Sequence, residues 1–248
     1  EISKLLDKHS LPTALRRLQQ LPPLQCLKGI EAEMPSVGID IERRIWLMVA
    51  ASTDDTAQVL RGAVKLSKVG TKEARQTAAE MLRGCRRPDL ETLVPAIQAA
   101  SVEMIDHDDH LGSLVLQVAS WLKSPSLVLK QAARDFLKEF TVDRLLEQVR
   151  HWPTQMCSAM AGLVAQVELD IAEHLKRELQ SPAPKRRLAA LQATQLLQCA
   201  DAVSKALMPL LNDPRLDVRV RTIDLLGALG HESLEQLIPE LLHDASTD

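Results

Sequence analysis

The chain has 248 residues, of which 46% are hydrophobic and 25% charged, a balance typical of a folded domain and not of a disordered one. Aromatic residues make up only 2% and only 9 residues are Gly, which disfavours a β-rich fold built on tight hairpins. The net charge of −3 gives no general attraction for nucleic acid, and no apolar run reaches the roughly 18 residues of a membrane-spanning helix. The composition therefore predicts an all-α protein with a core of Leu, Ala, Val and Ile.

Apolar residues recur at three- and four-residue steps along nearly the whole chain, and alternation with a period of two is almost absent. Prolines fall at the edges of these segments, where a helix tolerates them. The pattern predicts helices of about 10–16 residues joined by short turns, so that consecutive helices run antiparallel. In chain order the predicted helices span residues 11–20, 24–34, 40–51, 54–69, 71–84, 89–105, 110–123, 126–139, 142–151, 154–167, 169–180, 184–199, 201–211, 216–229 and 232–243.

A unit of about thirty residues recurs in the second half of the chain. Turn prolines stand 28, 29 and 32 residues apart, at Pro125, Pro153, Pro182 and Pro214. The fifth residue after each proline is Lys130, Ser158, Arg187 or Arg219, and the eighth is Ala133, Ala161, Ala190 or Thr222. Arg75 and Ala78 form an upstream copy of the same pair. A unit of this length is one helix–turn–helix, which buries its apolar stripe only by stacking on its neighbours.

The stretch 211–219, Leu-Asn-Asp-Pro-Arg-Leu-Asp-Val-Arg, resembles the signature of HEAT repeats. In that family an Asp-Pro turn follows the first helix, and a Val-Arg pair and a small residue open the second. Residues 201–229 match it well, 168–199 and 110–139 moderately, and 141–167 weakly because Ser158 replaces the cation. The resemblance implies an α-solenoid of antiparallel helix pairs in a right-handed superhelical stack. We expect one array over 1–248, with degenerate helical pairs over 1–70 and recognisable HEAT-like repeats over 71–248.

The two repeated positions have different expected roles. A small residue lets the axes of two crossing helices come close together. A cation in the first turn of a helix opposes the helix dipole, so another interaction must favour it. The resemblance implies a ladder between such cations and acidic groups of adjacent repeats, with Asp213 and Asp217 as candidate partners of neighbouring arginines. The alternative is that the repeat cations line a surface for an acidic or helical protein segment. These cations are Arg75, Lys130, Arg187 and Arg219.

The two ends of the sequence suggest a fragment. The chain opens on Glu1 without a Met, and residues 237–248 repeat the pattern of 207–217 without the Val-Arg pair that should follow. We therefore expect an incomplete last repeat and a longer parent protein.

Other clusters have simpler interpretations than a site. Asp-His-Asp-Asp-His at 106–110 carries metal-binding groups, but adjacent loop residues rarely converge on one ion, which favours a solvated acidic loop. The cysteines at 26, 85, 157 and 199 form no CxxC pair and are expected to be buried thiols in a reducing compartment, the cytoplasm. Basic groups at 83–87, 185–187 and 215–221 could contact nucleic acid, but the net charge and the scarcity of aromatics argue against it.

No GxSxG, HExxH, P-loop or GxGxxG pattern is present, so we expect no enzyme activity and no cofactor. The sequence predicts a non-catalytic protein–protein interaction scaffold. The alternatives are a regulatory or spacer domain of a larger multidomain protein and, with less support, a binder of the nucleic-acid backbone.

Overall fold

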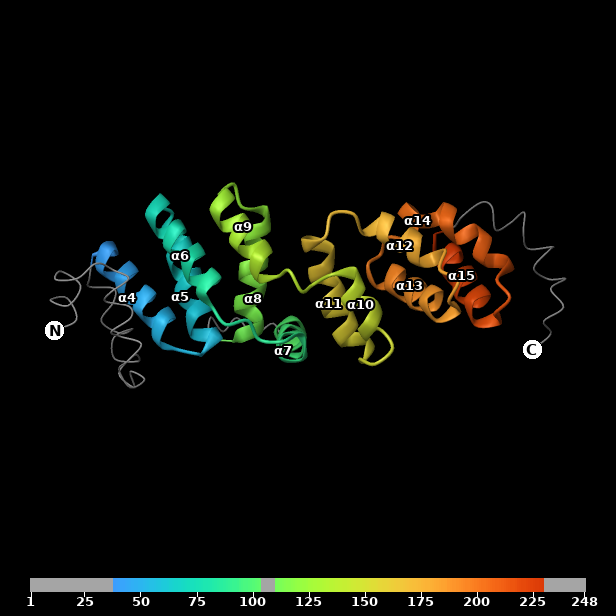
Figure 1. Cartoon of the computed structure of the whole chain (residues 1–248), viewed down its shortest axis with the longest axis horizontal. Helices are drawn as coiled ribbons and strands as arrows, with labels where there is room; N and C mark the ends of the chain where they lie inside the picture. The colour runs from blue at the N-terminus through green and yellow to red at the C-terminus, as the bar shows by residue number, and fades with distance from the viewer. Residues whose placement is uncertain (1–37, 104–109, 230–248) are drawn as a thin grey trace. The chain divides into compact units, whose positions relative to one another are not determined.

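The computed structural model describes residues 38–103 and 110–229, which contain twelve α-helices and two 3-10 helices and no β-strand (Figure 1). The helices are α4 (Ile39–Ser52), α5 (Thr56–Val69), α6 (Lys72–Gly84), α7 (Leu90–Glu103), α8 (Leu111–Ser120), η2 (Trp121–Lys123), α9 (Leu127–Phe136), α10 (Val142–Gln148), α11 (Thr154–Val167), α12 (Ile171–Leu179), α13 (Pro184–Leu196), α14 (Ala200–Leu207), η3 (Met208–Asn212) and α15 (Leu216–Ala228). The all-α class is thus confirmed for the described residues. The helices predicted over 11–20, 24–34 and 232–243, and the expected incomplete last repeat, lie outside them.

Each helix predicted between residues 40 and 229 is present, and most ends fall within three residues of the prediction. Two predicted helices, 110–123 and 201–211, end as the separate 3-10 helices η2 and η3. Pro209 explains the second break, because a residue without an N–H cannot continue the hydrogen-bond ladder of α14. Pro95 departs from the expected pattern, since it lies inside α7 and not at a segment edge.

Short polar side chains begin several of these helices. Asp55 accepts a hydrogen bond from a backbone N–H in the first turn of α5 at 3.0 Å, and Thr71 and Thr141 do the same for α6 and α10 at 3.2 and 3.3 Å. Each bond satisfies one of the N–H groups that a helix start leaves without a partner. Gly70 ends α5 with φ at +83°, a backbone conformation that glycine adopts at little cost.

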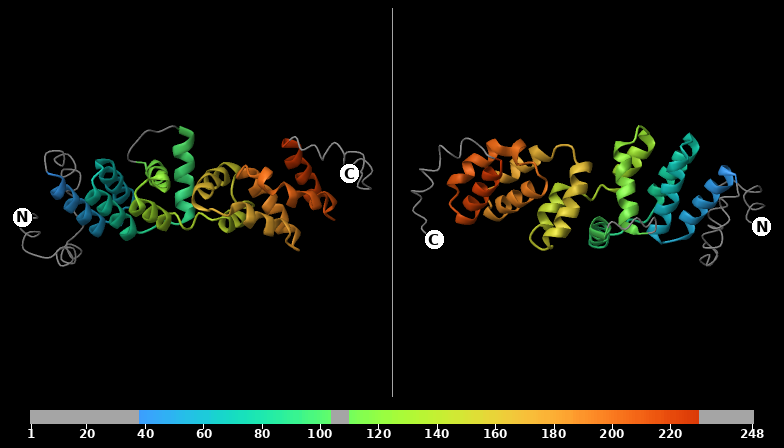
Figure 2. Two further views of the ribbon diagram at one scale, coloured as in Figure 1. Left: turned by 90° about the horizontal axis from the view of Figure 1, so that it is seen from above. Right: turned by 180° about the vertical axis from the view of Figure 1, so that it is seen from behind.

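The chain divides into two compact units, residues 1–138 and 139–248. In the first unit α4 contacts α5 and α6, α5 also packs on α6 and α8, α6 packs on α9, and α7 lies against α8. In the second unit α10, α12 and α14 contact one another in order, and so do α11, α13 and α15 (Figure 2). Neighbouring helices therefore pack together within each unit, and the expectation of one array over 1–248 stays a prediction.

The small residue of the repeat is buried at every position that the alignment selected. Relative exposure is 0% at Ala78, Ala133, Ala190 and Thr222 and 1% at Ala161. The Thr222 hydroxyl donates to the Val218 carbonyl at 2.8 Å, so its polar group is satisfied inside the core. The positions predicted to sit between packed helices are thus confirmed as interior.

Two glycines of the first unit allow still closer contacts. A Cβ added to Gly62 in α5 would stand 2.2 Å from the ring of Trp46. A Cβ on Gly112 in α8 would stand 2.0 Å from the Ala96 carbonyl oxygen in α7. Because a backbone atom cannot turn aside as a side chain does, the contact between α7 and α8 requires glycine at position 112.

Candidate interaction groove

The repeat cation Arg187, in the first turn of α13, is buried with a relative exposure of 8%. Its Nε and Nη2 donate to the two carboxylate oxygens of Asp213 at 2.7 and 2.9 Å. Its Nη1 donates to the carbonyls of Ser181 and Pro182 at 2.9 and 3.1 Å. This bidentate pair joins the start of α13 to the turn that precedes α15, so it links two successive helix pairs.

Arg219 has an equivalent position at the start of α15 and is half-buried. Its Nη1 donates to the Asp213 carbonyl at 2.9 Å, six residues upstream, as Arg187 donates to the carbonyl of Ser181 six residues upstream. Each carbonyl belongs to the residue before a turn proline. A cation in the first helical turn, unfavourable for the dipole alone, is therefore stabilised by the carbonyl of its own turn.

The two candidate acidic partners differ. Asp213 binds the arginine of the preceding helix pair, as the ladder alternative requires. Asp217 binds Arg215, two residues before it, at 2.6 Å, and thus stays within its own helix pair. This Arg215 bond lowers the pKa of the Asp217 carboxyl, and the same hydrogen bond raises the pKa of Arg215.

Arg75 and Lys130 lie in the first unit and are half-buried. No side-chain hydrogen bond or ion pair joins either of them to another residue in the described ranges 38–103 and 110–229. Arg187 and Arg219 both bind Asp213 in the second unit, and the Arg187 pair is a link between repeats of the kind that the ladder alternative expects. A partner-binding role for the four cations stays a prediction.

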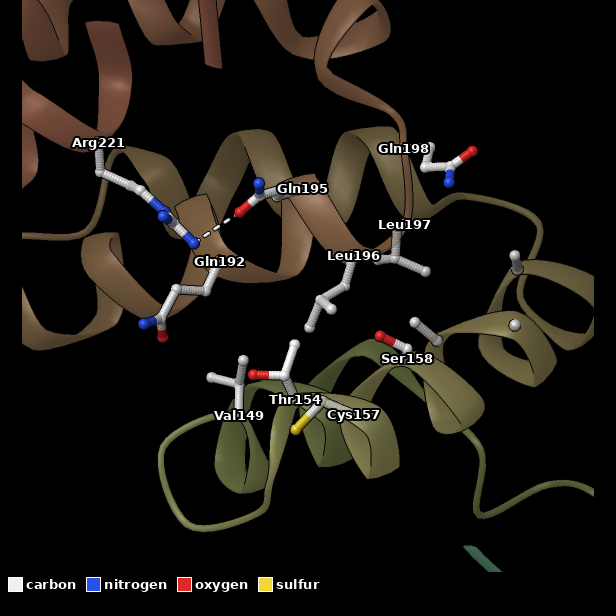
Figure 3. Close-up of a pocket in the computed structure, with 13 residues that line it drawn as sticks. Val149, Thr154, Cys157, Ser158, Gln192, Gln195, Leu196, Leu197, Gln198 and Arg221 are labelled. Atoms are coloured by element: carbon white, nitrogen blue, oxygen red, sulfur yellow. Dashed lines mark hydrogen bonds between the residues drawn. The ribbon is translucent and has the colours of Figure 1, made fainter. Parts of the chain in front are cut away.

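A groove of about 560 Å³ opens in the second unit between α11 and α13, with Arg221 of α15 at one side (Figure 3). The α11 wall presents the small residues Ser158, Gly162 and Ala165. The opposite wall presents carboxamides, from Gln192 and Gln195 on α13 and Gln198 just after it. One wall is thus almost bare, and the other is rich in groups that both donate and accept hydrogen bonds.

The α11 wall is bare because two of its exposed positions carry small residues. Ser158 occupies the repeat position where Lys130, Arg187 and Arg219 carry a long cationic side chain, and it is exposed. Gly162 lies in the middle of α11, is also exposed, and a Cβ there would meet nothing within 4 Å. The repeat that matched the motif most weakly, 141–167, is therefore the one whose second helix borders the groove.

Charge and hydrogen bonding in the groove centre on Arg221, the only charged side chain among the thirteen lining residues. Its Nη2 donates to Gln195 Oε1 at 2.5 Å, as the dashed line in Figure 3 marks. Arg221 Nε and Gln192 Oε1 are both buried and have no hydrogen-bond partner in the part of the chain that the structure describes. A buried donor and a buried acceptor without partners cost stability, so a ligand that supplies both partners would recover it.

The C-terminal end of α13 forms the rim of the groove. Gln198 has φ at +52°, the left-handed conformation that usually favours glycine. The Cys199 N–H then reaches the Thr194 carbonyl at 3.2 Å, and the Gln198 N–H reaches Gln195 at 3.1 Å, which closes the helix end. The rim is therefore fixed by a strained residue whose side chain lines the groove.

The cysteines largely follow the prediction. Cys85 and Cys157 are buried free thiols, whereas Cys199 is only half-buried and Cys26 lies outside the described residues. Burial raises the pKa of all three described thiols. Cys157 lines the groove, but as a protonated thiol it adds weakly polar surface and not a nucleophile.

The remaining candidates from the sequence yield no further site. Residues 106–109 of the Asp/His cluster lie outside the described residues, and the residues that are described hold no group of three metal-binding side chains. In the basic group 185–187, Arg186 binds Glu178 at 2.7 Å and Arg187 binds Asp213, so much of its charge is neutralised internally. Within the described ranges, no helix is long and apolar enough to cross a membrane.

Comparison with protein families, with curated proteins and with solved structures found no match for this chain. The resemblance to HEAT repeats thus rests on the residues of the chain alone.

Proposed function

We propose that the chain is a non-catalytic protein–protein interaction scaffold built from HEAT-like helix pairs, and that the groove between α11 and α13 is its docking surface. The observation that carries the proposal is the open α11 wall at Gly162, where an exposed glycine in mid-helix packs against nothing. Glycine weakens a helix interior, and no packing contact from the described residues of the unit offsets that cost. A residue whose identity the packing of the fold does not explain is expected at a functional surface.

The packing order of the second unit supports the solenoid part of the proposal. First helices contact first helices and second helices contact second helices, which is the pattern of stacked helix pairs. The Arg187–Asp213 pair also lies where a ladder between repeats belongs. The free thiols of Cys85 and Cys157 support the accompanying proposal of a reducing compartment, the cytoplasm.

Protein binding is favoured over nucleic-acid binding because three arginines of the basic groups in the second unit are engaged internally. Arg186, Arg187 and Arg215 each pair with a carboxylate at 2.6–2.7 Å. Contact with phosphates would have to break these pairs before it gained anything from counterion release.

The test is a display library of overlapping natural protein segments, selected on the purified chain, with each recovered segment measured by titration calorimetry. We expect segments that bind with a Kd in the micromolar range or below, with a negative heat-capacity change, and that are recovered with unchanged mass. A chain that selects no such segment, or that chemically alters the ones it binds, is not an interaction scaffold.

A further inference from the structure

The bare α11 wall of the groove favours an extended occupant. The groove holds about 560 Å³, and the small residues Ser158, Gly162 and Ala165 form one of its walls. A narrow extended backbone can lie directly against that wall, because no side chain at position 162 keeps it away.

The carboxamide wall suits a main chain. A glutamine side chain carries the same donor and acceptor groups as a peptide bond, so it can pair with any extended backbone whatever its sequence. Gln192 and Gln198 are among the residues that line the groove, and Gln192 Oε1 is a buried acceptor with no partner among residues 38–103 and 110–229. An incoming backbone N–H supplies the donor that Gln192 needs.

Arg221 sets the charge of the occupant. Its Nε is a buried donor without a partner in the described part of the chain, and its Nη2 is held only by the neutral Gln195. No carboxylate lines the groove. Nε and Nη2 form one edge of the guanidinium group, which matches the two oxygens of a carboxylate.

Charges just outside the groove leave this preference intact. Asp224 is exposed one turn beyond Arg221 on α15 and is not among the lining residues. The cations Arg187 and Arg219 are held at Asp213 and do not line the groove, so Arg221 is the positive group among the lining residues.

We infer that the groove between α11 and α13 binds an extended acidic peptide segment. An Asp or Glu side chain of that segment pairs with the Nε–Nη2 edge of Arg221 and releases Gln195. The backbone of the segment runs along Gly162 and donates to Gln192 Oε1. This inference rests on the proposed scaffold function and names the partner class of its groove.

The experiment uses random dodecapeptides displayed on phage, selected on the whole chain, with the recovered peptides synthesised and measured by fluorescence polarisation. We expect enrichment in Asp and Glu and Kd values that rise at least tenfold on the Arg221→Gln chain. The Arg221→Lys chain keeps the charge but loses the two-donor edge, so it should bind with intermediate affinity. Lys205→Gln removes an exposed cation of α14 outside the groove and should change nothing.

Gly162→Leu fills the groove from the α11 side and should abolish binding. Its matched control is Gly227→Leu, because Gly227 is also an exposed helical glycine with open space around it but lies outside the groove. Far-UV circular dichroism and the urea midpoint check that each variant folds.

The named outcomes separate the two proposals. Peptides that lack acidic residues, that ignore Arg221→Gln, or that bind the Gly162→Leu chain as well as the parent overturn the inference while scaffolding by another surface stands. Failure to select any peptide overturns it too, and the scaffold proposal is then judged by the protein-segment library alone.

Discussion

The closest glycine contacts among the described residues lie in the first unit, although Gly84 at the end of α6 faces open space as well. In the first unit a Cβ added to Gly62 would stand 2.2 Å from the Trp46 ring, and a Cβ added to Gly112 would stand 2.0 Å from the Ala96 carbonyl oxygen. In the second unit Gly162 and Gly227 face open space, with nothing within 4 Å of the position of a Cβ. Gly62 and Gly112 thus permit close packing between helices in the first unit, and Gly162 and Gly227 leave part of a helix surface bare in the second.

The units also differ in the polar bonds that link their helices. In the second unit the buried Arg187–Asp213 pair joins successive helix pairs. Two links of the first unit have neutral acceptors: Arg43 donates to the Thr77 hydroxyl at 2.9 Å, and the Thr56 hydroxyl donates to the Arg86 carbonyl at 2.9 Å. A similar order of helices is therefore compatible with different means of joining them.

The largest effect is expected from Asp213→Ala. It leaves the buried Arg187 guanidinium without its carboxylate, which we expect to lower the free energy of unfolding by about 3–5 kcal/mol. Urea denaturation followed by circular dichroism measures the change.

The double variant Arg187→Met/Asp213→Ala removes both charges and should recover much of that loss, since the single variant is dominated by the unpaired charge. Lys130→Met, at the repeat position of the first unit, should cost little. Equal losses for the Asp213 and Lys130 variants would remove the distinction between the two units.

Gly112→Ala tests the close packing of the first unit. The added methyl meets the Ala96 carbonyl oxygen, so α7 and α8 must move apart, at a cost of about 1–3 kcal/mol. Gly162→Ala in the second unit meets nothing and should stabilise the chain by about 0.5–1 kcal/mol, because alanine favours a helix interior. Urea midpoints that move in the same direction for both variants would show that the glycines do not differ as described.

The structural features that could be predicted from the sequence are those that recur at a fixed spacing along the chain. Ala133, Ala161 and Ala190 could be placed in the interior because a turn proline precedes each of them by the same eight residues. For the cation at Arg187 the sequence leaves two alternatives open, a pair with an acidic group of the next repeat or a surface for a partner. Spacing alone does not distinguish a buried cation from an exposed one.

The groove could not be predicted in the same way, because it depends on side chains that are small or absent. Its signals in the sequence were Ser158 at a repeat position for a cation and a glycine in mid-helix at 162. Arg221 stood out only as a member of a basic group, and its contact with Gln195 joins residues 26 apart. The left-handed conformation of Gln198 has no signal, since no glycine marks it.

Gln198 and Gly70 offer a smaller test, because both adopt the left-handed conformation at or near a helix end, one in each unit. Gln198→Gly should raise the free energy of unfolding by about 1 kcal/mol, since glycine carries no steric cost there. Gly70→Ala should lower it by about the same amount. A loss on Gln198→Gly would mean that the side chain supports the fold and not only the groove.

The smallest effect concerns two exposed carboxylates whose pKa values are lowered for different reasons. Hydrogen bonds from Thr92 lower the pKa of Asp89 in the first unit, and a hydrogen bond from the charged Arg215 is the main cause for Asp217 in the second. A carboxyl whose pKa is lower in the folded state adds stability above its unfolded value, near 3.9, and loses it as the pH falls through the folded value. Both contributions should therefore fade below about pH 4.

Carboxyl carbon NMR titrations in 0.1 and 1 M NaCl separate the two causes of the lowered pKa values. Salt should bring the pKa of Asp217 back toward its ordinary value, because it screens an exposed ion pair, and should leave Asp89 nearly unchanged, because its partners are neutral. Equal salt effects on both would show that the charge of Arg215 has no special role.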